Sequence, residues 1–302
     1  MQMTLKWIKN LLLVMLNVFP IIITLLNMFL LISFSLISYE NSSYLSFIII
    51  LVLFSYIEIS FLLSCFVKPC SLEDYQIIPS YKINEISLNS CKDILLNENN
   101  QKLRNIIFHN EKPKLPFCKQ CKRYKAIRSH HCSICNKCIF KMDHHCIIIN
   151  NCIGMNNHRY FLQFLFFAQI YVIYIMLYSL IHYNTQYLKY KVWRSTILLC
   201  LISCVILSVF NIWQWSFALQ GKTTIEYWMM KDNYKINERI ISDFGFSNWR
   251  DNLYMIFGTK SIYRALFIIN LNKLDYSPLI WTRVVYRNNT NLISLFNKKL
   301  ID

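Results

Sequence analysis

The hydrophobic residues of this chain are gathered into four long runs, instead of recurring at the short intervals typical of a soluble core. A helix that crosses a bilayer needs roughly 20 consecutive apolar residues. Four runs meet this requirement: Leu11–Ile37, Ser43–Val67, Phe161–Ile181 and Ser195–Phe217. Glu58 is the only charged residue within them. The pattern predicts an all-α polytopic membrane protein with four transmembrane helices.

The polar positions divide the remainder of the chain. The N-terminal tail and the first two spans occupy residues 1–67, and a polar segment follows at 68–159. The third and fourth spans fall within 160–217, and a largely polar region covers 218–302. Cysteine and histidine concentrate in the last part of the middle segment, at about 115–159. We expect this part to form a separate domain between the second and third spans.

The positive charge of the chain follows the same division. All but three of the 32 lysine and arginine residues lie in the N-terminal tail, in 68–159 or in 218–302. Positively charged loops stay in the cytosol, so both termini and the middle segment are predicted to be cytosolic. The sequence does not distinguish the ER or Golgi from the plasma membrane. We interpret the net charge of +16 as a surface that binds anionic lipid or an anionic substrate, and not nucleic acid.

Seven of the 12 cysteines fall between Cys118 and Cys152. Cytosolic thiols stay reduced, so this density indicates metal binding or catalysis and not disulfide bonds. Two C-x2-C pairs begin at Cys118 and Cys132, and each is typical of one structural zinc site. Two closed sites of three cysteines and one histidine use six thiols. One cysteine is therefore left over.

The spacing alone does not say which cysteine is the spare one. Cys146 is the best placed, because it directly follows Asp143, His144 and His145. A base, a carboxylate that orients it and a further metal ligand are then all available at adjacent positions. The segment therefore predicts zinc binding, together with a free thiol that is suited to covalent chemistry.

A contiguous stretch from Cys118 to Phe161 matches a known pattern. The matching positions are Cys118, Cys121, Arg128 to Cys132, Cys135, Cys138, Asp143 to Cys146, Asn150 to Cys152, Gly154, Asn157 and Arg159 to Phe161. The stretch resembles the cysteine-rich domain of the DHHC-type protein S-acyltransferases (palmitoyltransferases), polytopic membrane enzymes that carry it between their second and third spans. After the fourth span, the residues from Thr223 to Glu226 fit the family motif TTxE. Asp243 to Gly258 is similar to its C-terminal motif, with Asn252 as the buried polar residue.

The resemblance implies two interleaved zinc sites with structural Zn²⁺. The first would use Cys118, Cys121, His131 and Cys138, and the second would use Cys132, Cys135, His145 and Cys152. Cys146 stays outside both sites, as does His144. With four protein ligands on each ion, neither zinc keeps an open position for catalysis.

The resemblance also implies an activity. Cys146 would take a long-chain acyl group, usually palmitoyl, from acyl-CoA and pass it to a cysteine of a substrate protein. His144 is the candidate base, oriented by Asp143, as in other nucleophile–base–carboxylate arrangements. Thr223, Thr224, Glu226 and Asn252 would support the active site. The residues that bind CoA, the substrate proteins, the oligomeric state and any accessory subunit are not indicated.

This chain departs from the family at two places. Ile147 and Ile148 follow the motif, where the family usually has Pro-Trp, and this change bears on the acyl-chain preference. Lys125-Ala126 replaces the usual Lys-Pro. Two other classes of protein stay open. An inactive zinc-stabilised membrane scaffold would fold without forming a thioester. A membrane-tethered nucleic-acid-binding zinc protein would need a recognition helix that the Cys-rich segment lacks.

Overall fold

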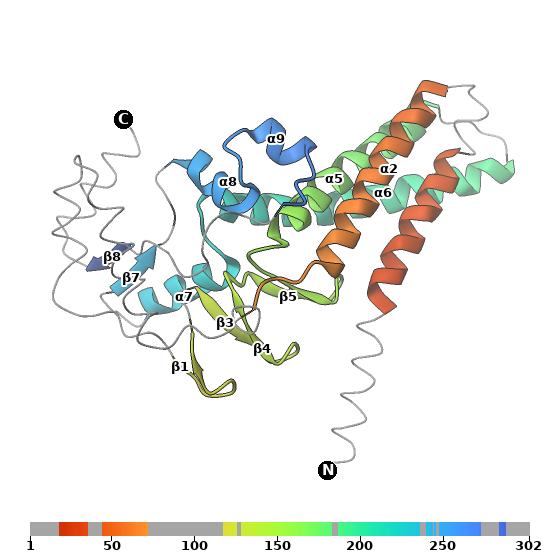
Figure 1. The fold of residues 1–302 in the computed structure, drawn as a ribbon. Helices are drawn as coiled ribbons and strands as arrows, with labels where there is room; N and C mark the ends of the chain where they lie inside the picture. The colour runs from red at the N-terminus through yellow and green to blue at the C-terminus, as the bar shows by residue number, and fades with distance from the viewer. Residues whose placement is uncertain are drawn as a thin grey trace, which may run out of the picture. The chain divides into compact units, whose positions relative to one another are not determined.

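The computed structural model describes residues 18–35, 44–71, 117–125, 128–182, 187–235, 240–243, 245, 248–272 and 284–287. Long helices account for most of the described residues (Figure 1). Four of them are long and apolar enough to cross a membrane: Val18–Ser35, Tyr44–Phe66, His158–Ile181 and Arg194–Leu219. The prediction of a mostly helical membrane protein with four spans is therefore confirmed. The first 17 residues, and most of the predicted lead-in at 71–112, lie outside the described residues.

Two of the helices extend further than their apolar runs. Helix α2 covers Tyr44–Phe66, within its run, whereas α5 covers His158–Ile181 and α6 covers Tyr187–Leu219. Helix α6 begins eight residues before the predicted run. Lys189, Lys191 and Arg194, which lie between the third and fourth predicted runs, therefore belong to its first turns. Hydrophobicity determines which part of a helix can cross the membrane, but it does not determine where the helix ends. A helix continues into a polar segment as long as its backbone hydrogen bonds can form.

The chain forms two compact units, each built from segments that are separated in the sequence. One unit contains residues 1–67, 145–151 and 157–215, and the other contains 68–144, 152–156 and 216–302. In the first unit, aromatic rings of α2 pack against α5. The ring centroids of Tyr56 and Phe167 are 4.2 Å apart, and those of Phe61 and Phe164 are 5.1 Å apart. Such contacts hold two apolar helices together by close packing.

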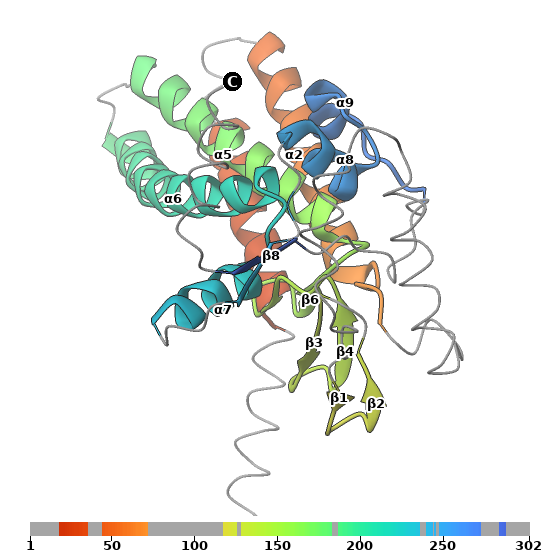
Figure 2. The same cartoon turned by 90° about the vertical axis from the view of Figure 1, so that its left-hand side faces the viewer.

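The Cys-rich segment is built on short antiparallel strands, which the sequence did not predict (Figure 2). The pairs are β1 (Phe117–Cys118) with β2 (Arg123–Tyr124), β3 (Ser129–Cys132) with β4 (Lys137–Phe140), and β5 (His144–Cys146) with β6 (Asn151–Ile153). Gly154 is needed beside β4. A Cβ atom there would lie 2.7 Å from Ile139 Cγ2 and 2.8 Å from the Pro69 carbonyl oxygen.

Three short helices and a strand pair follow α6. They are α7 (Thr224–Lys235), β7 (Ile240–Asp243), α8 (Trp249–Phe257), α9 (Ile262–Phe267) and β8 (Val284–Arg287), with β7 paired to β8. Local side chains define the helix ends. The Asn248 side chain accepts a hydrogen bond from the Arg250 N–H at the start of α8, and Gly258 ends that helix in the left-handed conformation. These are common capping signals, and they define the two ends of α8.

Candidate zinc centres and active site

Each C-x2-C pair forms a tight turn around its first sulfur. The Cys121 N–H donates to Cys118 Sγ at 3.4 Å, and the Cys135 N–H donates to Cys132 Sγ at 3.3 Å. In both turns the next residue has a left-handed backbone, with φ of 52° at Lys122 and 54° at Asn136. The two turns therefore have the same geometry, and each presents a pair of sulfurs to one point.

The β3–β4 hairpin explains why the two predicted zinc sites interleave. His131 lies opposite Cys138 in the antiparallel register, and Cys132 lies opposite Lys137. Successive side chains of a strand point to opposite faces. His131 and Cys132 are thus sent to different sides of the same strand, and each joins a different C-x2-C pair. The partition that the family resemblance implied has a physical cause in this alternation.

The structure brings the eight predicted ligands together as two groups of four. The groups are Cys118, Cys121, His131 and Cys138, and Cys132, Cys135, His145 and Cys152, and within each the ligand atoms all lie within 4.8 Å of one another. Zn–S bonds of about 2.3 Å place two sulfurs of a tetrahedral site about 3.8 Å apart. The Cys121–Cys138 distance between sulfurs is 3.7 Å. Both groups therefore fit a metal ion, and their thiolate and imidazole donors suit zinc.

The electrostatics of the first group also favour a cation. Burial raises the pKa of the Cys138 thiol, and hydrogen bonds with the thiols of Cys118 and Cys121 raise it further. Neighbouring thiolates repel one another, and a divalent cation between them removes this repulsion by holding the thiolate form. Without a metal ion, these buried sulfurs would be unfavourable as thiolates. A zinc ion needs its cysteine ligands in the thiolate form, and its positive charge stabilises that form.

Asp143 and His144 form a directly bonded pair. His144 Nδ1 lies 2.7 Å from Asp143 Oδ2. The Asp143 side chain is fully buried, while that of His144 is 23% exposed. Two further bonds come from Thr224, whose backbone N–H donates to Oδ1 at 2.8 Å and whose hydroxyl donates to Oδ2 at 2.9 Å. With these three bonds the carboxylate is held in one orientation, and it can fix the imidazole in turn.

Cys146 is the last residue of strand β5 and is 7% exposed. Because side chains alternate along a strand, His144 and Cys146 project from one face of β5 and His145 from the other. His145 is the member of β5 that belongs to the second zinc group. A single three-residue strand thus directs one histidine to metal binding, and the other histidine and the remaining thiol to the opposite side.

The TTxE-like motif is the N-terminal cap of α7. The Thr223 N–H donates to Glu226 Oε2 at 2.9 Å, and the Glu226 N–H donates back to Thr223 Oγ1 at 3.3 Å. This reciprocal pair is a capping box, which satisfies two backbone donors at a helix start. Thr224 is the first residue of the helix, so the cap determines where its hydroxyl and N–H point. Those two groups are the ones that contact Asp143.

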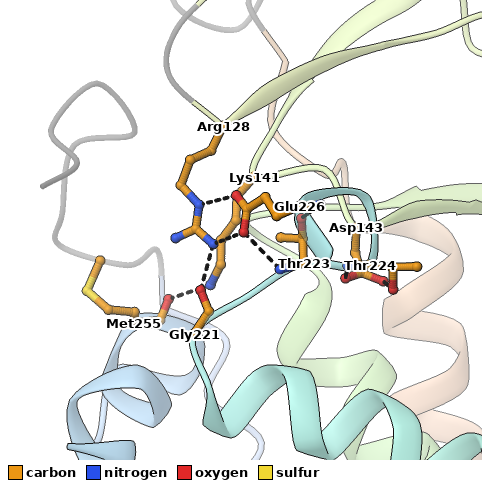
Figure 3. A network of polar contacts seen from close by, with 8 residues as sticks. All are labelled: Arg128, Lys141, Asp143, Gly221, Thr223, Thr224, Glu226 and Met255. Atoms are coloured by element: carbon orange, nitrogen blue, oxygen red, sulfur yellow. Dashed lines mark hydrogen bonds and ion pairs between the residues drawn. The ribbon is translucent and has the colours of Figure 1, made fainter. Parts of the chain in front are cut away.

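Arg128 ties this cap to the Cys-rich segment (Figure 3). Its guanidinium donates from Nε to Glu226 Oε1 at 2.6 Å and from Nη2 to Glu226 Oε2 at 2.8 Å, and Nη2 also donates to the Gly221 carbonyl at 2.8 Å. The two side chains are only 2% and 8% exposed. Arg128 adopts a left-handed backbone with φ of 65°, which aims its side chain at the cap. A buried bidentate pair of this kind is geometrically specific.

Lys141 is the second cation in this region. It is 3% exposed, has φ of 46°, and its ammonium donates to the Met255 carbonyl on α8 at 3.4 Å. Burial lowers the pKa of Lys141 to about 7, and the charge of Arg128 lowers it as well, while Glu226 and Asp143 oppose the shift. These four buried groups balance two positive and two negative charges.

Asn252 of α8 is 2% exposed and donates to the Leu219 carbonyl at 2.9 Å. Gly221 lies against it in the left-handed region, with φ of 70°. The contact fastens α8 to the segment that leads into α7. Asn252 is therefore buried as expected from the sequence, and it acts on the end of α6 instead of on Asp143 or His144.

Comparison with known proteins gives one consistent result. Residues 111–231 match the family model described as DHHC palmitoyltransferase. The palmitoyltransferase PFA3 of Candida glabrata is 27% identical over 239 residues, covering 75% of this chain and 68% of the relative. PFA3 of Saccharomyces cerevisiae is 32% identical over 44% of this chain and 46% of the relative, and ZDHHC16 of Bos taurus is 55% identical over 22% of this chain and 17% of the relative. Residues 111–231 are therefore similar to a DHHC palmitoyltransferase domain, and the chain is similar to several palmitoyltransferases.

The matched domain and the named relatives indicate the predicted enzyme class, protein S-palmitoyltransferase. The part of the chain that the family model covers includes both metal groups, strand β5 and the α7 cap. Sequence reasoning identified every residue of the metal groups and of the Asp143–His144 pair. It missed the roles of Arg128 and Lys141. The spacing of Thr223 and Glu226 is itself a capping-box signal, whereas nothing in the sequence indicates that Arg128 bonds to it.

Proposed function

We propose that the chain transfers a long-chain acyl group, palmitoyl by preference, from acyl-CoA to cysteine thiols of substrate proteins through an acyl-enzyme at Cys146. The observation that carries this proposal is the position of Cys146. It is the one cysteine of the Cys118–Cys152 segment outside both metal groups, and it shares a strand with His144. The similarity to DHHC palmitoyltransferases supports palmitoyl transfer in general, and the assignment of the thioester to Cys146 goes beyond it.

Two steps account for the reaction. The Cys146 thiolate attacks the acyl-CoA carbonyl carbon, a new S–C bond forms, and the bond to the CoA sulfur breaks with CoA leaving as its thiolate. A thiolate of the substrate protein then attacks the Cys146 thioester and returns Cys146 as a thiolate. His144 takes the Cys146 proton before the first step and can protonate the departing CoA sulfur. Asp143 holds His144 Nδ1, which leaves Nε2 for this proton.

Each metal group would hold a structural Zn²⁺. Four protein ligands would close the coordination of each ion, so the zinc would have no open position and would contribute rigidity to the hairpins. His145 would be bound to the second ion while its neighbour Cys146 stays free. Ligation of His145 would then fix the backbone of β5, on which both His144 and Cys146 depend.

The membrane helices suit the acyl donor. Each methylene moved from water into an apolar environment contributes about 0.8 kcal/mol, so a long acyl chain gains much of its binding energy by entering the helical region. We propose that both termini and residues 68–159 face the cytosol, where acyl-CoA and substrate cysteines are available. Ile147 and Ile148, which are 49% and 44% exposed, replace the Pro-Trp usual in the family. The preferred chain length is the property that this replacement bears on most directly.

Self-acylation in vitro tests the proposal. The full chain is purified in detergent with its zinc, incubated with palmitoyl-CoA that carries a clickable tail, and compared with Cys146→Ala. Cys70→Ala is a matched control, because Cys70 is also buried, at 2% exposure, and lies outside both metal groups. We expect a hydroxylamine-sensitive label on the wild type and on Cys70→Ala, and none on Cys146→Ala.

Two other results would contradict this proposal, and one of them would indicate an inactive scaffold. Zinc content, measured on the same samples, separates loss of chemistry from loss of folding. A wild-type chain with two zinc ions that takes no label would refute the transferase proposal and support the inactive scaffold. A label that persists in Cys146→Ala would place the thioester on another cysteine.

A further inference from the structure

Lys141 lies between the hairpin that carries metal ligands and the strand that carries His144. It directly follows β4, which ends at Phe140, and it precedes β5, which begins at His144. Its side chain is buried, and its backbone is left-handed, with φ of 46°. A left-handed backbone is unfavourable for a long side chain, and glycine or asparagine normally occupies it. A long basic residue that is kept in this conformation is a candidate for a functional role.

The side chain of Lys141 reaches a second element, helix α8. Its nitrogen donates to the carbonyl oxygen of Met255 at 3.4 Å (Figure 3). Met255 belongs to the last turn of α8, which ends at Phe257. The carbonyls of a last turn lack the N–H partner that a continuing helix would supply, and lysine is one of the side chains that bond to them. The bond therefore attaches the C-terminal end of α8 to the segment between β4 and β5.

The next two residues are held by other parts of the same unit. Met142 is buried in an apolar cluster, and Ile225 of α7 packs against that cluster. The Asp143 N–H donates to the Ile153 carbonyl at 2.8 Å, and the Asp143 carboxylate accepts both bonds from Thr224. Three consecutive residues are thus fixed in turn by α8, by the core and by α7. The Lys141 contact is the one of these that reaches α8.

The burial of Lys141 does not favour stability. Taking an amine out of water disfavours its charged form, and burial lowers the pKa of Lys141 to about 7. The charge of Arg128 acts in the same direction, while Glu226 and Asp143 oppose it. An apolar side chain of similar length would avoid the desolvation of the amine. The presence of lysine here therefore points to a role other than stability.

We propose that Lys141 is a positioning residue for acyl transfer, which ties the end of α8 to the segment that carries Asp143 and so holds Asp143 in the orientation that His144 requires. Asp143 lies two residues further along the chain, and its carboxylate is 2.7 Å from His144 Nδ1. The region after the fourth span then acts on Asp143 by two routes, through Thr224 of α7 and through Lys141 from α8. The inference rests on the proposed function, in which His144 is the base for Cys146.

Three substitutions separate positioning from stability. Lys141→Met removes the donor at similar length, and Lys141→Arg keeps a donor and a charge. Lys231→Met is a matched control, because Lys231 is an exposed lysine of α7 in the same unit. The full chain is purified in detergent with its zinc, and the rate of self-acylation is measured over a range of palmitoyl-CoA concentrations.

The expected result is a loss in rate and not in donor binding. The maximal rate of Lys141→Met should fall at least about tenfold, with the half-saturating donor concentration within about twofold of the wild type. Lys141→Arg should recover most of the rate, and Lys231→Met should match the wild type. All three variants should keep two zinc ions, and Lys141→Met should unfold at pH 7 at the wild-type temperature or above it.

Amide hydrogen exchange reports the contact without any chemistry. In the peptides that cover 140–146 and 253–258, we expect exchange at least about threefold faster in Lys141→Met than in the wild type, and unchanged in Lys231→Met. This readout is needed because a loss of rate alone does not show which contact was lost.

Three outcomes would overturn the proposal. One is a Lys141→Met enzyme within about twofold of the wild-type rate, and another is an arginine variant as slow as the methionine variant. The third is a loss of rate that comes with lost zinc or a lower melting temperature, which would make Lys141 a structural residue only. A wild type that takes no label would instead refute the acyl-enzyme at Cys146, and Lys141 would then be judged by the exchange measurement alone.

Discussion

The hydroxyl of Thr224 provides the sharpest test of how the region after α6 acts on the active site. Its Oγ1 donates to Asp143 Oδ2 at 2.9 Å, and Asp143 is fully buried. Thr224→Val keeps the shape of the side chain and removes this bond, while the backbone N–H bond to Oδ1 remains. The carboxylate that orients His144 would then lose one of its donors.

The magnitude follows from the charge and the burial of the acceptor. A hydrogen bond to a charged group is worth about 1.5–3 kcal/mol, and about 1.4 kcal/mol corresponds to a factor of ten. If the bond acts fully on the orientation of the Asp143–His144 pair, the rate of self-acylation falls about tenfold to a hundredfold. Thr224→Ser restores the hydroxyl and should recover most of the rate.

The assay is the initial rate of self-acylation at saturating palmitoyl-CoA, with zinc content and the melting temperature measured on the same samples. Both variants should keep two zinc ions, because Thr224 belongs to neither metal group. The reasoning would be refuted by a Thr224→Val enzyme within about twofold of the wild-type rate, or by a serine variant as slow as the valine variant.

Three further substitutions probe the same unit. Glu226→Gln leaves the buried Arg128 guanidinium without its charged partner, so thermal unfolding should show a loss of about 3–5 kcal/mol, and an unchanged melting temperature would contradict this. Lys141 has a pKa of about 7 when folded and about 10.4 when unfolded, so the unfolded chain binds more protons between these values and stability rises with pH. The stability of the wild type relative to Lys141→Met should therefore increase from pH 7 to pH 10. A stability difference that does not change with pH would contradict this prediction. Gly221→Ala puts a Cβ against Asn252 Oδ1 and 2.7 Å from Gly245 Cα at a φ of 70°, so the melting temperature should fall, with a loss of roughly 1–3 kcal/mol.

The membrane helices and the C-x2-C pairs were predictable from the sequence because each has a local signal, whereas the division of the ligands between two sites came from the family resemblance. Apolar runs identify spans by length alone, and the count of cysteines left one thiol over before any fold was known. The short β-hairpins were not predictable, since strands of two to four residues carry too little periodicity. Their register nevertheless decides the outcome, because it sends His131 and Cys132 to different faces of β3.

The buried charge pairs were not predictable for a different reason. Arg128 and Glu226 are 98 positions apart, and a single sequence contains no signal that joins them. The left-handed backbone at Arg128 and at Lys141 also has no signal in the sequence, because such a φ is usual for glycine or asparagine and not for long basic residues. The tertiary contacts of both side chains stabilise the backbone in these conformations.

A single-turnover chase tests the central claim most directly. The enzyme is loaded with labelled palmitoyl-CoA, freed of excess donor, and mixed with a peptide that carries one cysteine. Peptide mapping then follows the label on the fragment that contains Cys146. The two-step account predicts that the label leaves this fragment at the rate at which it appears on the peptide. Label that stays on Cys146 while the peptide is acylated only by fresh donor would contradict the account.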